Sequence, residues 1–222
     1  MKKDLCELII IIDESGSMGI ITNDTIGGFN TFLETHQKLP GDANLTLVKF
    51  DTKYEIVHNG VDVRSVKPLD KTTYSPGGCT ALLDAVGKAI DEVGKRYDAL
   101  SEEEKPGKVI FLIITDGEEN SSKEYTLKHI KDKTTQRQNI DKWEFIFMGA
   151  NQDAWAAAGH MGYANAVNYS VTDINRTMKA AAVYSMNSRM YSEKTSLDNF
   201  NLSDADLDNE IKNAPQKDNS KT

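Results

Sequence analysis

Two strongly apolar segments of the chain are each followed at once by oxygen-bearing side chains. Asp13, Ser15 and Ser17 follow the run LIIII, and Asp116 follows the run VIFLIIT. Thr80 lies between them in the glycine-containing stretch SPGGCTALLD. Carboxylates and hydroxyls are hard oxygen donors, and two carboxylates balance a divalent charge while leaving room for waters and an outside ligand. The five residues therefore predict a metal site for Mg²⁺, with Mn²⁺ or Ca²⁺ as alternatives.

The spacing within the first motif has a mechanical reason. In IDESGSMG the carboxylate and both hydroxyls occupy alternating positions, so they can surround a turn while the intervening side chains point elsewhere. Gly16 and Gly19 allow the backbone to bend closely. On its own this stretch also matches an ordinary polar turn at a helix start. Thr80 and Asp116 make the metal site the favoured interpretation.

Strand-like apolar segments alternate along the chain with helical ones. Runs such as IIII and VIFLII are apolar at nearly every position, which is typical of parallel strands covered by helices on both faces. The expected strands are LCELIIIID, NLTLVKFD, YEIVHNGV, KVIFLIITD, WEFIFMGA and ANAVNYSV, the second and third forming an edge hairpin. Helices are expected near Asp24–Lys38, Thr80–Leu100, Glu124–Asn139, Asp153–Met161 and Asp173–Met190, with Thr80 as the N-cap of the second.

This alternation predicts an α/β fold with a doubly wound, mostly parallel central sheet of about six strands flanked by helices. A chain of 222 residues is enough for one such domain, which we expect over residues 1–191. Residues 192–222 are poor in aliphatic side chains and rich in Asp, Asn, Ser and Lys. They predict a flexible acidic tail with one docked turn around 197–202. In open α/β sheets ligands bind at the carboxyl ends of the strands, where the candidate residues lie.

Three motifs in this order carry a family resemblance. DESGS, the threonine in SPGGCTALLDAVG, and ITDGEEN resemble the metal-ion-dependent adhesion site of a von Willebrand factor type A domain. The resemblance extends over nearly the whole chain up to about Tyr191. It is greater to compact bacterial and phage members of the family than to animal integrins. The resemblance implies a Rossmann-like fold with a metal at the edge of the sheet.

The resemblance also implies a role for each motif residue. Ser15, Ser17 and Thr80 would coordinate the metal directly, and Asp13 and Asp116 would bind it directly or through water. A Glu or Asp of a partner protein would complete the coordination. We therefore expect a non-catalytic, Mg²⁺-dependent protein-binding module.

Other classes of function are less well supported by the sequence. The four histidines are scattered, and the chain has no nucleophile elbow, P-loop or GxGxxG motif, so we do not expect an enzyme. A net charge of −8 argues against a nucleic-acid partner. Two alternatives stay open. One is a regulatory subunit of an intracellular ATPase, stress-response or phage system, and the other is an RNA-binding relative of the Ro ribonucleoprotein family.

The cysteines and the first residues of the chain indicate in which cellular compartment the protein is expected. Cys6 and Cys79 are too few for a disulfide framework, and the opening apolar run is interrupted by Asp4 and Glu7, unlike a signal peptide. No segment has the length and apolar character of a membrane span, so we expect a cytoplasmic protein. The oligomeric state stays open.

The acidic tail raises one more hypothesis. A flexible carboxylate tethered to the domain could occupy the free coordination position and inhibit the site. The candidates are Asp204, Asp206, Asp208 and Glu210.

Overall fold

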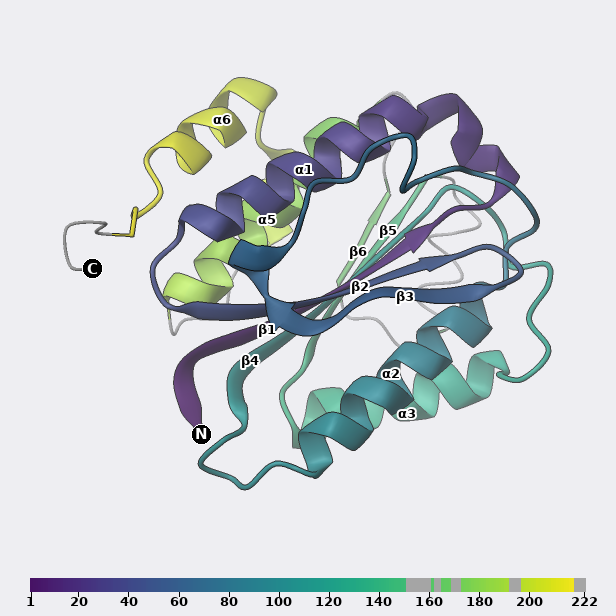
Figure 1. The fold of residues 1–222 in the computed structure, drawn as a ribbon, viewed down its shortest axis with the longest axis horizontal. Coiled ribbons are helices and arrows are strands. Elements are labelled where there is room, and N and C mark those ends of the chain that lie inside the picture. The colour runs from purple at the N-terminus through teal and green to yellow at the C-terminus, as the bar shows by residue number, and fades with distance from the viewer. Residues whose placement is uncertain (151–160, 162–164, 169–172, 192–196, 218–222) are drawn as a thin grey trace.

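The fold is built on one central sheet, shown in the computed structural model of Figure 1. The structure describes residues 1–150, 161, 165–168, 173–191 and 197–217, and in that part of the chain six strands form one sheet in the order β3-β2-β1-β4-β5-β6. β3 runs antiparallel to β2, and the other neighbouring pairs are parallel. The strands are β1 (Lys2–Asp13), β2 (Asp42–Phe50), β3 (Tyr54–Asp62), β4 (Pro106–Thr115), β5 (Glu144–Gly149) and β6 (Asn165–Asn168).

Helices cover both faces of the sheet. Figure 1 shows α1 and α5 on one face, α2 and α3 on the other, and α6 outside α1 and α5. The helices are α1 (Thr22–Lys38), α2 (Leu82–Asp98), α3 (Leu127–Ile140), α5 (Ile174–Met190) and α6 (Asp204–Lys212), and the 3₁₀ helices are η1 (Gly16–Ile21), η2 (Val63–Ser65) and η4 (Leu197–Asn201). The predicted α/β class, with a mostly parallel doubly wound sheet and an edge hairpin, is confirmed.

The central strands are apolar throughout because each of their faces is buried. Along β1, Leu8, Ile10 and Ile12 belong to the core beneath α1 and α5, whereas Ile9 and Ile11 belong to the core beneath α2 and α3. Successive side chains of a strand point to opposite faces, so both cores draw on every residue of such a run. β4 alternates in the same way between the two cores. This rigid centre holds the ends of β1 and β4 in place.

The predicted helices agree with the structure at most positions. α1, α2, α3 and α5 begin and end within three residues of the expected bounds. The helix expected over Asp153–Met161 lies outside the described residues, except for Met161, which is buried. Of the strand expected over 164–171, the structure describes β6.

Residues 197–217 are structured where the sequence predicted a flexible tail. The docked turn around 197–202 is present as η4, and the chain then continues into α6. Leu207 is fully buried, and Phe200 and Ala214 are buried around it. With Ile211, Leu207 forms a short apolar stripe at helical spacing, and it packs against the core beneath α1 and α5. The low average hydrophobicity of the segment concealed this stripe.

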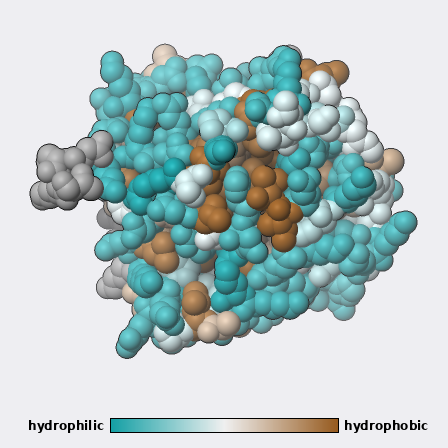
Figure 2. All heavy atoms as spheres, in the orientation of Figure 1, coloured by the Kyte–Doolittle hydropathy of each residue, from teal (hydrophilic) through white to brown (hydrophobic). Residues whose placement is uncertain are grey.

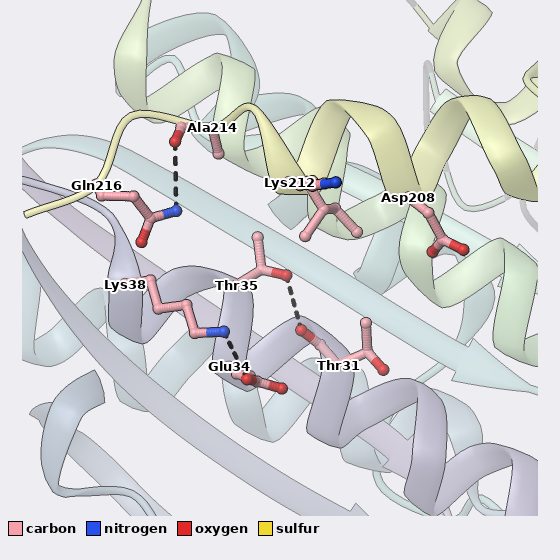
Figure 3. A pocket seen from close by; sticks show the side chains of 9 residues that line it. Thr31, Glu34, Thr35, Lys38, Asp208, Lys212, Ala214 and Gln216 are labelled. Atoms are coloured by element: carbon pink, nitrogen blue, oxygen red, sulfur yellow. Dashed lines mark hydrogen bonds and ion pairs between the residues drawn. The ribbon is translucent and has the colours of Figure 1, made fainter.

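The contact between α6 and α1 leaves a groove of about 490 Å³. Figure 3 shows its wall on α1, where Lys38 pairs with Glu34 at 2.6 Å and the Thr35 hydroxyl donates to the Thr31 carbonyl at 2.8 Å. These polar groups are satisfied within their own helix.

The outer surface is mainly polar. The face in Figure 2 is largely hydrophilic, with hydrophobic residues gathered near its middle. Among the helices that the structure describes, none combines the length and apolar character needed to cross a lipid bilayer.

Candidate functional site

The carboxyl ends of β1 and β4 lie where the chain changes direction across the sheet. From β1 the chain runs outward through β2 and β3, and it then crosses to β4 on the other side of β1. Ile12 is paired with Ile114, so Asp13 and Thr115 end their strands side by side. The crevice at such a switch point is the usual ligand site of an open α/β sheet.

Asp13 is fully buried at the end of β1. Its Oδ1 accepts a hydrogen bond from the Ser15 backbone N–H at 2.7 Å, and its Oδ2 accepts one from the Thr115 hydroxyl at 2.6 Å. The Asp13 carbonyl accepts a third from the Tyr74 hydroxyl at 2.7 Å. These bonds hold both carboxylate oxygens in one orientation. Thr115 and Tyr74 were not recognised from the sequence, although Thr115 directly precedes Asp116.

Two serine hydroxyls connect the end of β1 to the loop after β4. The Oγ atoms of Ser15 and Ser17 lie 3.2 Å apart, and the Ser17 hydroxyl donates to Asp116 Oδ1 at 2.7 Å. Ser15 is buried, Asp116 is half-buried, and Ser17 is exposed. The cluster therefore runs from the interior of the molecule to its surface.

Thr80 reaches the same place from the third loop. A Cβ atom added to Gly117 would lie 2.9 Å from Thr80 Oγ1, 3.4 Å from Ser17 Oγ and 3.7 Å from Asp13 Oδ2. Oxygens from two segments far apart in the chain therefore surround one small space, which the glycine of a third segment leaves open. Gly117 was not singled out in the sequence, where it is only the residue after Asp116.

The loop after β1 and the loop that carries Thr80 are joined through their backbones. The Gly16 N–H donates to the Gly78 carbonyl at 3.1 Å, and the Gly77 N–H donates to the Glu14 carbonyl at 2.7 Å. Gly78 has a φ of +74°, and a Cβ there would lie 2.7 Å from Asp51 Oδ2. Only glycine fits this conformation without strain. The glycines of SPGGCT therefore shape the loop that presents Thr80.

A largely buried ion pair also holds these two loops together. Glu14 and Lys49 are both largely buried, with Lys49 Nζ 3.2 Å from Glu14 Oε1. The same Glu14 oxygen accepts a hydrogen bond from the Ser75 N–H at 2.6 Å, and Lys49 donates to the Thr73 carbonyl at 2.8 Å. Glu14 thus ties the segment between Asp13 and Ser15 to the next loop.

Thr80 is not the N-cap of α2, contrary to the sequence prediction. That position belongs to Ala81, which makes no side-chain cap. The loop after β4 supplies the missing acceptors, since Glu119 Oε2 accepts from the Leu83 N–H at 2.8 Å and Asn120 Oδ1 accepts from the Thr80 N–H at 3.0 Å. Backbone N–H groups at the start of α2 are thereby hydrogen-bonded by side chains of another loop. The Thr80 hydroxyl is left to face the oxygen cluster.

The two carboxyl groups are held in an environment that disfavours negative charge. Burial raises the pKa of the Asp13 carboxyl to about 6, the charge of Asp116 acts in the same direction, and hydrogen bonds from Thr115 and Ser15 oppose the shift. Burial also raises the pKa of Asp116, against a hydrogen bond from Ser17. A cation between these groups would stabilise both ionised forms.

The residues present fit a hard divalent cation. Oxygens of Thr80, Ser17 and Asp13 face the space beside Gly117, and Ser15 and Asp116 are linked to them through Ser17. Oxygen ligands of this kind are the ones that Mg²⁺, Mn²⁺ and Ca²⁺ prefer. In the described part of the chain, no three His, Cys, Asp or Glu side chains gather closely enough to hold a metal. The candidate site is not a cluster of that kind, because hydroxyls supply three of its five side chains.

Cys79, beside Thr80, is exposed. The side chain points out of a loop whose backbone is turned by Gly78.

The hypothesis of self-inhibition by the tail finds no support in the docked position of α6. Asp204 and Asp208 lie 3.4 and 2.8 Å from Lys179 Nζ on α5. α6 contacts the far end of α1, near Lys38, whereas α1 begins at Thr22 beside the site. A helix of 17 residues is about 25 Å long, so the α6 carboxylates lie well away from the oxygen cluster.

Comparison with known proteins places the fold. No family model and no curated protein matches the sequence. Among solved structures, a von Willebrand factor type A protein from Catenulispora acidiphila has a TM-score of 0.55 at 14% identity, covering 82% of this chain and 42% of its own. The chain has a von Willebrand factor type A fold.

Two further structures share this fold. Proximal thread matrix protein 1 from the mussel byssus has a TM-score of 0.54 at 13% identity, over 80% of this chain and 45% of its own. Manganese-loaded TRAP protein from Plasmodium vivax has a TM-score of 0.51 at 20% identity, over 72% of this chain and 64% of its own. The present chain thus spans less than two thirds of each of these structures.

Proposed function

We propose that this protein is a non-catalytic, metal-dependent protein-binding module with an intact metal-ion-dependent adhesion site. The observation that carries the proposal is the convergence of Thr80, Ser17 and Asp13 oxygens on the space beside Gly117, with Ser15 and Asp116 linked to them by short contacts. The type A fold and the manganese-loaded state of the Plasmodium vivax neighbour support a divalent cation at this position.

The motif residues take the roles that the family resemblance implies. Ser15, Ser17 and Thr80 are direct ligands, while Asp13 and Asp116 bind directly or through water. A bound Mg²⁺ ion supplies a positive charge and an open coordination position for an acidic side chain of the partner. Thr115 keeps the Asp13 carboxylate oriented toward the cluster, as supporting hydrogen bonds do at metal sites.

Binding without catalysis is favoured because the histidines that the structure describes are engaged or placed elsewhere. His36 Nε2 lies 2.8 Å from Ser185 Oγ in the core between α1 and α5, and His129 caps the start of α3. His58 lies in the middle of β3, paired with Leu47. His160 lies outside the described residues. A metal without a general base at hand is poorly equipped for hydrolysis.

The proposal is tested by affinity capture with three forms of the protein, in Mg²⁺ and in EDTA. Wild type is compared with Asp116→Asn and with Glu118→Gln, a matched loss of one charge at an exposed position two residues away. We expect one or more proteins to be retained by wild type and Glu118→Gln in Mg²⁺ only, and not by Asp116→Asn. Retention of RNA regardless of metal would contradict the proposal and support the RNA-binding alternative.

A further inference from the structure

A cavity of about 340 Å³ lies at the end of the sheet opposite the candidate metal site. Its walls come from the start of β1, from β4, from the turn between α1 and β2, and from the last two residues of α5. Figure 1 shows the start of β1 and the end of α5 at the left of the view. Cys6 lines the cavity and lies seven positions before Asp13 on β1, which corresponds to about 23 Å along the strand. The cavity is therefore separate from the oxygen cluster.

Arg189, which lines this cavity, differs from the other arginines of the chain. It is half-buried, and no Asp or Glu among the described residues forms an ion pair with it. Each of the other four arginines has at least one acidic partner: Arg64 pairs with Asp42 and Asp62, Arg96 with Glu7, Arg137 with Asp98 and Asp141, and Arg176 with Asp173. A charge that is withdrawn from water is normally paired, so the exception points to a missing anion.

The hydrogen bonds that Arg189 makes within the described chain all go to neutral acceptors. Nη1 lies 2.8 Å from His36 Nδ1 and 3.2 Å from the His36 carbonyl oxygen, and Nη2 lies 3.4 Å from the Pro40 carbonyl oxygen. A guanidinium has five N–H donors, so these three bonds leave Nε and one proton of Nη2 for another acceptor. Burial lowers the pKa of the Arg189 guanidinium below its ordinary value, because the charged form is poorly solvated there. An anion at the remaining donors would stabilise that form.

The cavity has one further cation and one carboxylate in its lining. Lys108 on β4 is paired with Glu144 at 3.1 Å, and an ammonium group has three donors, so it can also bind a second anion. Asp4 is exposed and forms no ion pair among the described residues. Its negative charge lies beside the cavity, so a group with one negative charge is favoured over a doubly charged one.

We propose that this cavity binds a small monocarboxylic acid with an apolar body, whose carboxylate is held by Arg189 and Lys108. The two oxygens of a carboxylate match the planar fork of a guanidinium. Leu5, Pro40 and Met190 line the same cavity and supply apolar contacts for the body of the acid. The volume falls within the range of small-molecule pockets, which combine apolar walls with a few polar groups that orient the ligand. This site is independent of the proposed metal-dependent function.

Calorimetric titration with sodium acetate, butyrate and hexanoate tests the proposal. The titrations are made in EDTA, so that no carboxylate can bind to a metal ion at the oxygen cluster. We expect one binding site per chain and an affinity that rises about fourfold for each methylene group that the cavity buries. Butyramide has nearly the same shape without the charge and should bind at least about tenfold more weakly than butyrate. Inorganic phosphate should also bind more weakly than butyrate.

Two substitutions with matched controls test the roles of the charged residues. Arg189→Lys keeps the charge but removes the fork, and it should weaken butyrate binding at least about tenfold. Arg176→Lys, thirteen positions away on the same helix, should leave the affinity unchanged. Asp4→Asn removes the exposed carboxylate beside the cavity and should strengthen butyrate binding by up to about fivefold. Asp132→Asn, at an exposed position on α3, is its control and should have no effect.

Asp4→Asn keeps the test decisive if Arg189→Lys does not fold, because Asp4 makes no ion pair among the described residues that its loss could disrupt. Butyrate binding that is unaffected by Asp4→Asn and by a folded Arg189→Lys protein would overturn the proposal. Equal binding of butyramide and butyrate, tighter binding of phosphate, or no binding of any of the three acids would also overturn it. Butyrate binding that requires Mg²⁺ and is lost in Asp116→Asn would place the carboxylate at the metal instead.

Discussion

The substitution Gly117→Ala should disable the candidate metal site while leaving the fold intact. The added methyl group would lie 2.9 Å from Thr80 Oγ1 and 3.4 Å from Ser17 Oγ, in the space that the oxygens surround. The Gly117 backbone does not have a positive φ, so alanine introduces no conformational strain. The perturbation therefore acts on the cluster of ligands and not on the chain that carries them.

The size of the effect follows from these distances. Ordinary contact of a Cβ begins at 3.4 Å, so Thr80 Oγ1 must move by about 3.4 − 2.9 = 0.5 Å. Mg²⁺ requires near-ideal octahedral geometry with oxygens at about 2.0–2.1 Å, and a shift of this size removes a ligand from range. Changes to the surroundings of metal ligands typically weaken binding by about 10–100-fold, or roughly 1.4–2.8 kcal/mol.

Calorimetric titration of Mg²⁺ into the purified protein measures this change. Gly19→Ala is the matched control, because a methyl group there meets nothing within 4 Å. Chemical denaturation in EDTA checks that both variants keep the stability of the metal-free wild type. Wild-type Mg²⁺ affinity in a folded Gly117→Ala protein would refute the placement of the metal in this space.

Three further predictions concern the parts of the fold that support the site or extend beyond it. Leu207→Ala should lower the free energy of unfolding by about 2–5 kcal/mol in urea titrations, because Leu207 is fully buried; an unchanged midpoint would mean that α6 is not part of the folded unit. Gly78→Ala should destabilise the protein by about 1–2 kcal/mol because φ at this position is +74°. Gly77→Ala should not, and equal effects of the two substitutions in urea titrations would contradict the requirement for glycine at position 78. Burial, reinforced by the facing Arg189, lowers the pKa of His36 well below 6.5, so the unfolded state takes up the proton first. Stability should therefore fall as pH drops below 6.5, by up to about 1.4 kcal/mol per pH unit from this group, and His36→Gln should remove that part of the slope in denaturation measured from pH 7 to 5.

The fold could be predicted from the sequence because its strongest signals are local. The runs LIIII and VIFLII are apolar on both faces of their strands, and only a sheet covered on both sides explains them. α2 was equally clear, since its apolar residues recur at helical spacing. The weak apolar stripe of α6 could not be recognised, because Leu207 and Ile211 stand among acidic and amide side chains and their burial depends on the distant helices α1 and α5.

The candidate site could be predicted in its residues but not in its construction. Asp13, Ser15, Ser17, Thr80 and Asp116 were proposed from motif and resemblance, and the structure brings them to one crevice. What escaped prediction depends on contacts between segments far apart in the chain. The capping of α2 by Glu119, the support of Glu14 by Lys49 and the space beside Gly117 arise only once β1 and β4 lie side by side.

The contact of His36 with Arg189 between α1 and α5 is another feature that the sequence alone could not predict. Arg189 Nη1 lies 2.8 Å from His36 Nδ1, and an arginine can only donate, so His36 accepts at Nδ1 and carries its proton on Nε2 toward Ser185. Two side chains of α5, about 150 positions from His36 in sequence, thus define its tautomer. No local pattern around His36 indicates this arrangement.

The central claim is that the oxygens beside Gly117 bind a divalent cation, and Mg²⁺ titration of wild type, Asp116→Asn and Glu118→Gln tests it most directly. The account predicts one Mg²⁺ bound per chain in wild type and Glu118→Gln, and loss of that binding in Asp116→Asn. No binding to wild type, or equal binding to all three proteins, would contradict it.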